Sequence, residues 1–504
     1  MDDALTQLRE RLAEIHDLGK AAALLSWDQQ TYMPRGAVAA RAEQLATLSR
    51  LSHALFIDDA TGRLLDDAAP LAERQPYDSD DASLVRVARR DYEQARRLPS
   101  DFVGELSRAG ATARGAWQAA RQRSDFAMFQ PHLERIVALV RRQADYLGYA
   151  DHPYDALLDL YEPEMRAADV RRLFAELREG LAPLVKAVAA NPAAVDDALL
   201  REGYDEQTQI RVGEQIIGAI GFDFERGRQD FSAHPFCTSF APTDVRITTR
   251  VSRDQLNEAL FGTLHEMGHA LYEQGVSPSL TRTLLARGAS LGIHESQSRM
   301  WENLVGRSRA FWQHFLPLLR RAFPEQLGGV DLEQFYRAIN RSQPSLIRVE
   351  ADELTYNLHV MLRFELELAL LEGQLAVADL PGAWNELMGQ YLGVTPPSDA
   401  LGVLQDVHWS GGMIGYFPTY TLGNVISAQL FERARADLGD LDGQIAAGEL
   451  GGLLGWLRRN VHAHGRKFTP NELLQRVVGG GIQAGPYLAY LRGKFGELYG
   501  LTSD

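Results

Sequence analysis

Helix-forming segments follow one another along almost the whole chain, and this feature restricts the fold more than any other. Apolar residues recur at helical spacing from Leu5 to Trp27. Further helices are predicted at residues 37–55, 82–97, 100–123, 126–147, 169–190, 206–220, 347–373, 382–392 and 427–438. Only residues 244–251 are β-branched and alternate as in a strand. We therefore predict a mainly α fold with one small β element.

The 504 residues contain no repeat, no low-complexity tract and no Pro/Ser-rich linker. Length alone suggests about three domains, but helices that continue from end to end favour one body. We therefore predict that residues 1–504 form a single domain, with two lobes around a cleft that the β element lines.

The overall charge and the single cysteine narrow the class of protein. A formal net charge of −15 disfavours nucleic acid and anionic membranes as partners. Cys237 is the one cysteine, so no disulfide can form within the chain, which fits a reducing compartment. The acidic start is not followed by the apolar segment of a signal peptide, and no run approaches 18 apolar residues. We expect a soluble cytoplasmic protein.

One stretch of the sequence indicates a chemical function more clearly than any other. It reads His265-Glu-Met-Gly-His269, the pattern H-E-x-x-H. Residues four apart lie on one face of a helix, so His265 and His269 can offer two imidazoles to one metal ion. Glu266 lies about 100° round the helix, where it can reach a metal-bound water instead of the metal. The pattern therefore predicts a hydrolytic metal site.

The alternative is a surface helix with two solvated histidines. The neighbouring residues are largely apolar, and buried imidazoles and carboxylates are costly unless they are paired or bound to metal. Ser252 and Gln255 have the spacing of a capping box, which predicts the start of this helix and places the histidines in its second half.

A catalytic zinc site needs three protein ligands and one open position. Glu295 is our candidate for the third ligand, because it begins a further helix and its charge suits a helix N-terminus. His294 is a weaker rival and fits better as a neighbour of the ligands. Without the upstream motif, Glu295 would be interpreted as a capping or solvated carboxylate. A histidine further downstream remains an alternative ligand.

Five segments in order resemble the motifs of the carboxypeptidase Taq family, a family of metal-dependent carboxypeptidases. They are Asp244-Val-Arg-Ile-Thr248, His265-Glu-Met-Gly-His269, Ile293-His-Glu-Ser-Gln-Ser298, Ile347-Arg-Val-Glu-Ala-Asp352 and Gly402-Val-Leu-Gln-Asp-Val-His-Trp409. The resemblance extends to Trp27-Asp-Gln29 and Met33-Pro34, so it covers nearly the whole chain. It implies a helical fold with a deep cleft like the neurolysin-type gluzincins, a homodimer, and Glu295 as the third ligand. The ion is expected to be zinc, with Co²⁺ or Mn²⁺ as alternatives.

Peptide hydrolysis also needs a base and donors to the oxyanion. Glu266 is expected to take the proton of the water and pass it to the leaving amine. Tyr420, Tyr416 and His408 are candidate oxyanion donors, and by resemblance to the wider helical gluzincins a His and a Tyr from this region have that role. The alternative for either tyrosine is a core aromatic with a satisfied hydroxyl.

A carboxypeptidase must recognise a terminal carboxylate, for which the bidentate fork of an arginine is best suited. Arg348 is our first candidate and opens the predicted helix at 347–373; the alternative is a helix pair with Asp352. Arg246 is the second candidate, although Asp244 can neutralise it.

Other polar residues have supporting roles in this prediction. His234 and His408 can assist in holding the substrate. Gln405 and Asp406 either orient a ligand histidine or brace a turn. The strand at 244–251 can pair with an extended peptide through its main chain, which would give broad specificity.

The sequence thus predicts a zinc carboxypeptidase acting on peptides with a free C-terminus. The rival on the same scaffold is an endopeptidase or oligopeptidase, which needs no free carboxylate. A further rival, from another class, is an inactive helical peptide-binding protein; the intact His265, Glu266 and His269 argue against it.

Overall fold

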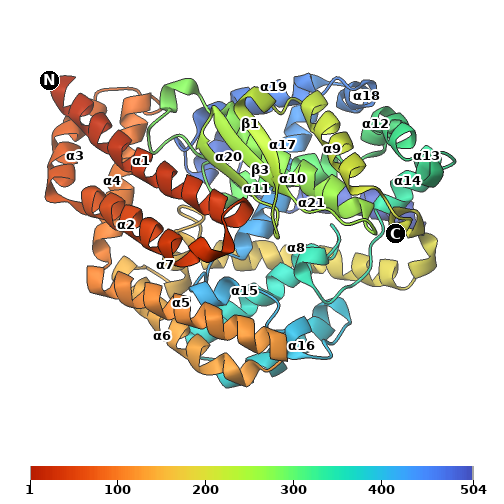
Figure 1. The fold of residues 1–504 in the computed structure, drawn as a ribbon, viewed down its shortest axis with the longest axis horizontal. Helices are drawn as coiled ribbons and strands as arrows, with labels where there is room; N and C mark the ends of the chain where they lie inside the picture. Colours follow the sequence, from red (N-terminus) through yellow and green to blue (C-terminus); the bar gives the residue numbers. More distant parts are fainter. Residues whose placement is uncertain (1, 502–504) are drawn as a thin grey trace. The chain divides into compact units, whose positions relative to one another are not determined.

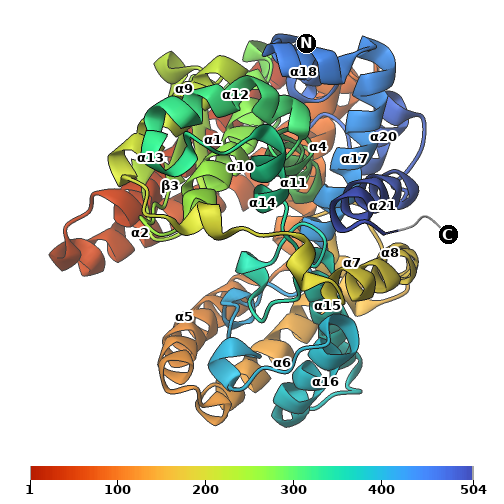
Figure 2. The same cartoon turned by 90° about the vertical axis from the view of Figure 1, so that its right-hand side faces the viewer.

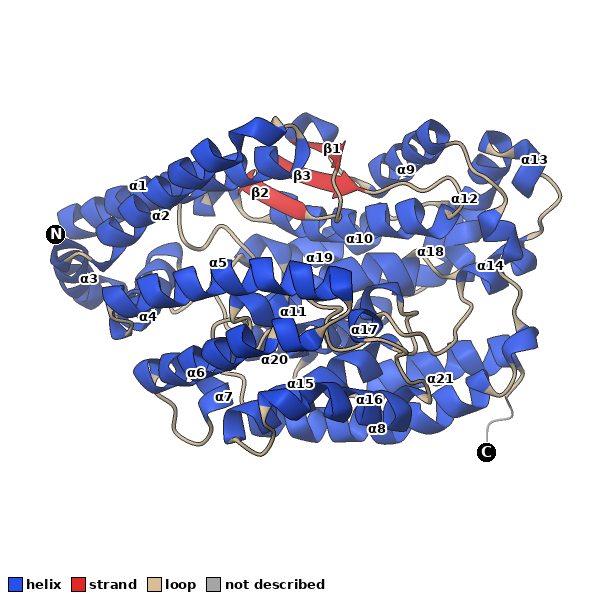
Figure 3. Cartoon of the chain, turned by 60° about the horizontal axis from the view of Figure 1, so that its bottom comes forward, coloured by secondary structure: helices blue, strands red, loops and turns tan. Residues whose placement is uncertain are grey.

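The computed structural model of the chain describes residues 2–501 and confirms a mainly α fold (Figure 1; Figure 3). The described α-helices are α1 (Asp2–Thr31), α2 (Val38–Ile57), α3 (Asp59–Ala72), α4 (Asp80–Arg97), α5 (Ser100–Arg123), α6 (Gln130–Leu147), α7 (Pro153–Leu158), α8 (Ala167–Ala189), α9 (Glu206–Ile220), α10 (Leu256–Gly275), α11 (Leu291–Arg299), α12 (Arg309–Ala322), α13 (Pro324–Leu327), α14 (Leu332–Ile339), α15 (Tyr356–Glu372), α16 (Leu380–Leu392), α17 (Pro418–Leu438), α18 (Leu441–Ala447), α19 (Gly451–Asn460), α20 (Pro470–Val478) and α21 (Gly485–Tyr499). None of them has the length and apolar content needed to span a lipid bilayer.

The chain divides into two compact units, each assembled from three separate stretches. Unit 1 comprises Met1–Arg96, Asp197–Ile339 and Ser427–Gly481. Unit 2 comprises Arg97–Asp196, Asn340–Ile426 and Ile482–Asp504. The H-E-x-x-H helix belongs to unit 1, whereas Arg348, His408 and the two candidate tyrosines belong to unit 2. The single domain with two lobes around a cleft stays a prediction.

A three-stranded sheet in unit 1 lies directly before the H-E-x-x-H helix in sequence. Its strands are β1 (Gly227–Phe231), β2 (Cys237–Ala241) and β3 (Asp244–Thr249), in the order β1-β3-β2. β3 pairs in parallel with β1 and antiparallel with β2, and it packs on α10 (Figure 3). The prediction of a single strand was therefore incomplete. Neither β1 nor β2 has the clear apolar alternation that makes β3 recognisable in the sequence.

The buried face of α10 explains why the sequence forms a helix here. Leu260, Leu264, Met267 and Leu271 recur at helical spacing and are almost fully buried. The predicted capping box was wrong, because the N-cap Gln255 makes no side-chain cap hydrogen bond. Ser252 instead forms an isolated β-bridge with Gln255, and its hydroxyl accepts a hydrogen bond from the backbone N–H of Asp254.

The predicted helix at 347–373 begins later than expected. Arg348–Glu350 is a short 3₁₀ turn, and α15 starts only at Tyr356. The carboxylate of Asp352 accepts hydrogen bonds from the backbone N–H groups of Leu354 and Thr355, so the chain turns before the helix forms. The alternative of an Arg348–Asp352 helix pair is thereby excluded.

Candidate metal centre and active site

The three predicted metal ligands come together in unit 1. His265 and His269 project from α10, and Glu295 projects from α11, which lies beside α10 in Figure 2. Oε2 of Glu295 is 3.7 Å from Nε2 of His265 and 3.4 Å from Nε2 of His269. Two atoms bound at 2.0–2.1 Å to a tetrahedral ion lie about 3.4 Å apart. The donor set and its spacing therefore fit one divalent cation.

Gly268 permits the close approach of the two helices at this point. A Cβ atom at position 268 would lie 2.6 Å from Cα of Ser298 and 2.7 Å from the carbonyl oxygen of Gln297. Both of these are backbone atoms of α11, which cannot move aside as a side chain can. The glycine between the two histidines thus lets α11 bring Glu295 up to them.

Glu302 orients the first of the two histidines. Its Oε2 lies 2.8 Å from Nδ1 of His265, which turns Nε2 of that ring towards Glu295. Glu302 sits in a π-helical segment, Met300–Val305, that continues α11, and such segments recur at functional sites. Arg299 donates hydrogen bonds to both Glu295 and Glu302, at 2.7 and 3.2 Å, and so ties the two carboxylates together.

The second histidine is oriented by another imidazole. Nδ1 of His269 is 2.6 Å from Nδ1 of His294, whose Nε2 is 2.8 Å from the carboxylate of Glu273. If Nε2 of His269 faces an ion, its Nδ1–H donates to His294, which donates in turn to Glu273. His294 thus contacts a ligand and lies outside the ligand group that the geometry selects.

Burial and the neighbouring carboxylates set the charge of the centre. Burial, with Glu295 and Glu302 adding to it, raises the pKa of Glu266 to about 7 against the opposing effect of His265. Burial alone would raise the pKa of Glu295, but Arg299 and His265 outweigh it and hold that carboxyl well below its usual range. A buried, anionic Glu295 beside two imidazoles is a good cation ligand, and Glu266 has the proton affinity of a base that works near neutral pH.

Arg348 belongs to a buried ion cluster in unit 2. Asp406 accepts hydrogen bonds from Nε and Nη2 of Arg348 at 3.1 and 2.7 Å, and from Nε of Arg363 at 2.6 Å. The amide oxygen of Gln405 binds the backbone N–H of Arg348 and the guanidinium of Arg363. In this structure Gln405 and Asp406 therefore hold two arginines and not a ligand histidine. Two guanidinium groups share one carboxylate, so the cluster keeps one net positive charge.

His408 and the two tyrosines adjoin this cluster. Nε2 of His408 is 3.1 Å from the hydroxyl of Tyr420, and the guanidinium of Arg348 lies 4.8 Å from the centre of the Tyr420 ring. The ring of Tyr416 packs 5.3 Å from that of His408. Burial lowers the pKa of His408 to about 4, so its imidazole is neutral at pH 7.

Glu367 holds the segment that carries His408. Its carboxylate accepts hydrogen bonds from Trp409 Nε1 at 2.8 Å, the Tyr154 hydroxyl at 2.7 Å and the Gly415 backbone N–H at 3.1 Å. Burial raises the pKa of Glu367 to about 7 despite these three donors. Two positions of the segment that follows His408, Trp409 and Gly415, are therefore held by one buried acid of α15.

The two remaining candidates lie elsewhere in unit 1. Val245 and Ile247 of β3 are fully buried, whereas Arg246 points to the other face of the sheet, where it binds Asp244 at 2.9 Å and stacks on Trp27. Arg246 therefore faces away from α10. His234 is exposed in the connection between β1 and β2, and its carbonyl accepts a hydrogen bond from Ser232.

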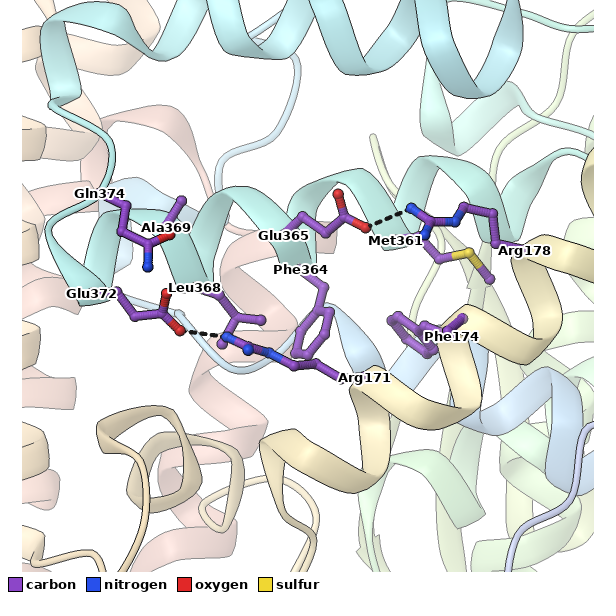
Figure 4. A pocket seen from close by; sticks show the side chains of 11 residues that line it. Arg171, Phe174, Arg178, Met361, Phe364, Glu365, Leu368, Ala369, Glu372 and Gln374 are labelled. Carbon is purple, nitrogen blue, oxygen red and sulfur yellow. Dashed lines mark hydrogen bonds and ion pairs between the residues drawn. The ribbon is translucent and has the colours of Figure 1, made fainter.

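A separate cavity of about 310 Å³ lies in unit 2 between α8 and α15 (Figure 4). Phe174 and Phe364 contribute to its apolar wall. Its charged residues pair with each other, Arg171 with Glu372 and Arg178 with Glu365. This cavity contains none of the predicted site residues.

Comparison with known proteins assigns the chain to a family. The model of the carboxypeptidase Taq (M32) metallopeptidases matches residues 7–495. The chain belongs to this family. Thermostable carboxypeptidase 1 of Thermus thermophilus is 46% identical over 99% of both chains, and carboxypeptidase 1 of Bacillus subtilis is 39% identical over 97% of both. The crystal structure of an M32 carboxypeptidase from Deinococcus radiodurans R1 is 47% identical, with a TM-score of 0.96 over 99% of this chain and 100% of that one.

As a member of the M32 family, the protein is a metallocarboxypeptidase, a peptide hydrolase that uses a divalent metal ion. The family resemblance recognised in the sequence is thereby confirmed. The sequence alone did not single out Glu302, Arg299 or Glu273 beside the metal centre, nor Arg363 and Glu367 in unit 2.

Proposed function

We propose that this M32 protein is a zinc carboxypeptidase that removes C-terminal residues from peptides with broad specificity. The convergence of His265, His269 and Glu295 at distances suited to one tetrahedral ion is the observation that carries the proposal. Two histidines and a glutamate are a usual ligand set for catalytic zinc in peptidases.

Zinc held by these three residues would polarise the scissile carbonyl and lower the pKa of a bound water to about 7. Glu266 follows His265 on α10 and accepts the proton of the attacking water. Its raised pKa, about 7, lets it release that proton to the leaving amine. Glu302 and His294 keep the two imidazoles turned for ligation throughout.

The oxyanion is stabilised in this proposal by Tyr420 or His408. The two groups are hydrogen-bonded to each other, so a neutral His408 can orient the Tyr420 hydroxyl, while the nearby positive charge of Arg348 favours a developing anion. Tyr416 contacts His408 only through its ring and is the weaker candidate.

Arg348 remains the proposed anchor of the terminal carboxylate. Support comes from the net positive charge of the Arg348–Asp406–Arg363 cluster. Arg246 is less suited, because it points away from α10 and is bonded to Asp244. His234 is proposed only as an accessory contact.

Broad specificity follows if the enzyme binds the main chain of the peptide. β3 is flanked on both sides, so the pairing proposed for it must move to an edge strand. We favour the edge strand β2, because it packs against α10, the helix that carries Glu266. N-methylation of substrate peptide bonds upstream of the cleavage site should raise KM; an unchanged KM at every position would contradict strand pairing.

We further propose that the enzyme is cytoplasmic and forms a homodimer. Its single domain would be arranged as two lobes around a neurolysin-like cleft. These parts rest on the family resemblance and on the presence of one cysteine. Size measurement in solution tests the dimer.

Metal analysis and a matched peptide pair test the function. The purified enzyme should contain about one zinc per chain, lose activity with a chelator and regain it with zinc. An endopeptidase would cleave a peptide and its C-terminal amide equally well, whereas the proposed carboxypeptidase should lose most activity on the amide. Equal rates on the two peptides would favour the oligopeptidase alternative.

A further inference from the structure

A stack of rings extends from the metal centre into the core of unit 1. The centres of the His269 and His294 rings are 4.7 Å apart, and their planes differ by 39°. The Tyr272 ring follows at 5.2 Å from His294, and the His462 ring at 5.0 Å from Tyr272, with interplanar angles of 37° and 31°. Tyr272 and His462 are fully buried. Each ring therefore limits how far the next one can turn.

Backbone segments pack against this stack at two points. A Cβ atom at Gly288 would lie 2.8 Å from Cδ2 of His294 and 3.0 Å from Cε1 of Tyr272. A Cβ atom at Gly275, the last residue of α10, would lie 2.6 Å from Nδ1 of His462. The rings touch main chain that has no side chain at these positions, which leaves them little room to move.

His462 also contacts the helix that carries the third ligand. It lies in the short 3₁₀ turn His462–His464, and its Nε2 is 2.9 Å from the amide oxygen of Gln297 in α11. An amide oxygen can only accept, so Nε2–H of His462 is the donor. The amide nitrogen of Gln297 donates in turn to the hydroxyl of Ser296 at 3.0 Å. Gln297 follows the ligand Glu295 by two residues.

The hydrogen bond to Gln297 lies where α10 and α11 approach each other. A Cβ atom at Gly268 would be 2.7 Å from the carbonyl oxygen of Gln297. Within the part of the chain that the structure describes, Nδ1 of His462 has no hydrogen-bond partner. The ring of His462 is therefore held by its stacking on Tyr272 and by its bond to Gln297.

We propose that His462 is a positioning residue of the metal centre. One route runs through the ring stack to His269, and the other runs through Gln297 to the helix of Glu295. The inference rests on the proposed function of these ligands in binding zinc. His462 acts on the ligands through other residues, so its effect is on their orientation.

Three replacements separate the two routes. His462→Phe keeps a ring without the donor, His462→Gln keeps an N–H donor without the ring, and His462→Ala removes both. None of them changes the charge at pH 7, because burial lowers the pKa of His462 to about 3. His464→Ala is the matched control, since His464 lies in the same turn but packs its ring 5.3 Å from that of Phe468.

Two measurements on the full-length enzyme report the state of the metal centre. Competition between the holoenzyme and a chromophoric chelator gives the zinc affinity. Co²⁺ can occupy a site of this kind, and its visible absorption spectrum reports the arrangement of its ligands. His462→Ala should lose about tenfold in zinc affinity and show an altered Co²⁺ spectrum, whereas His464→Ala should match the wild type in both.

The Phe and Gln variants show which route matters. Weaker zinc binding in His462→Phe alone assigns the role to the bond with Gln297, weaker binding in His462→Gln alone assigns it to the stack, and losses in both assign it to both routes. A lower melting temperature with wild-type zinc affinity and Co²⁺ spectrum in all three variants would overturn the proposal, because His462 would then serve stability alone. Failure of the underlying metal function shows separately, as wild-type protein that binds no zinc or whose activity resists chelation.

Discussion

Nδ1 of His265 lies 2.8 Å from Oε2 of Glu302, and this contact fixes which nitrogen of the ring faces Glu295. His269 has a neighbour of a different kind, the imidazole of His294, at 2.6 Å. Nδ1 of His265 is therefore bonded to a carboxylate, and Nδ1 of His269 to an imidazole. A direct carboxylate partner raises the basicity of a ligand histidine, so the two imidazoles contribute differently to the metal site.

Replacing Glu302 should weaken metal binding. Glu302→Gln keeps an acceptor for His265 but removes the charge, so we expect about a tenfold loss of zinc affinity, and up to about a hundredfold for Glu302→Ala. Competition with a chromophoric chelator measures both values. Glu325→Gln, an exposed position on α13, should leave the affinity unchanged. Wild-type affinity in Glu302→Ala would show that this contact does not support the site.

Gly268 and Gly262 offer a matched pair on α10. A methyl group at 268 would meet the backbone of α11, so Gly268→Ala should destabilise the protein by roughly 1–3 kcal/mol and weaken zinc binding. Nothing lies within 4 Å of a Cβ at 262, so Gly262→Ala should stabilise by about 0.5–1 kcal/mol. Denaturant unfolding and zinc titration report both effects. The same change in both variants would contradict the close helix approach.

Glu367 should give stability a pH dependence. Its folded pKa, about 7, lies above the ordinary value of 4.5, so the folded state binds the proton more tightly. This contribution is fully present below pH 4.5 and is lost as the pH rises through 7. Glu367→Gln does not titrate, so the melting temperature of the wild type should fall relative to that variant between pH 5 and pH 8. A constant difference over this range would contradict the raised pKa.

Arg348→Ala tests the proposed anchor. Loss of the Arg348 guanidinium should raise KM for free-acid peptides much more than for their amides, because only the free acid carries the carboxylate. Arg363→Lys is a useful comparison, because it keeps the charge of the cluster while disturbing the other guanidinium contact of Asp406. Equal effects of Arg348→Ala on acids and amides would refute the anchoring role.

The sequence reveals the parts of the site that depend on local spacing. His265 and His269 follow from helical periodicity, and Glu295 was chosen as an acid expected to begin the next helix. In the structure α11 already begins at Leu291, so Glu295 lies in its second turn. Glu302 could also have been predicted from spacing, because it follows Glu295 by seven residues, which is two helical turns, with Arg299 between them. Three metal ligands had already been predicted without Glu302, so the spacing of the motifs did not indicate a role for another acid.

Contacts between segments that are far apart in the sequence could not be predicted from residue spacing. Arg348 and Asp406 are 58 residues apart, and only the folded chain shows that they bind each other and that Asp352 serves the backbone instead. The strands β1 and β2 are short and lack a clear apolar pattern, so β3 was the only strand with a recognisable signal.

Glu266→Gln tests the central claim most directly. Zinc content and the release of C-terminal residues from a free-acid peptide are measured on the same purified sample. The variant should retain about one zinc per chain and lose activity by about 10²- to 10⁴-fold, because the ligands remain while the base is gone. Hydrolysis close to the wild-type rate by the zinc-loaded variant would contradict the assignment of Glu266 as the base.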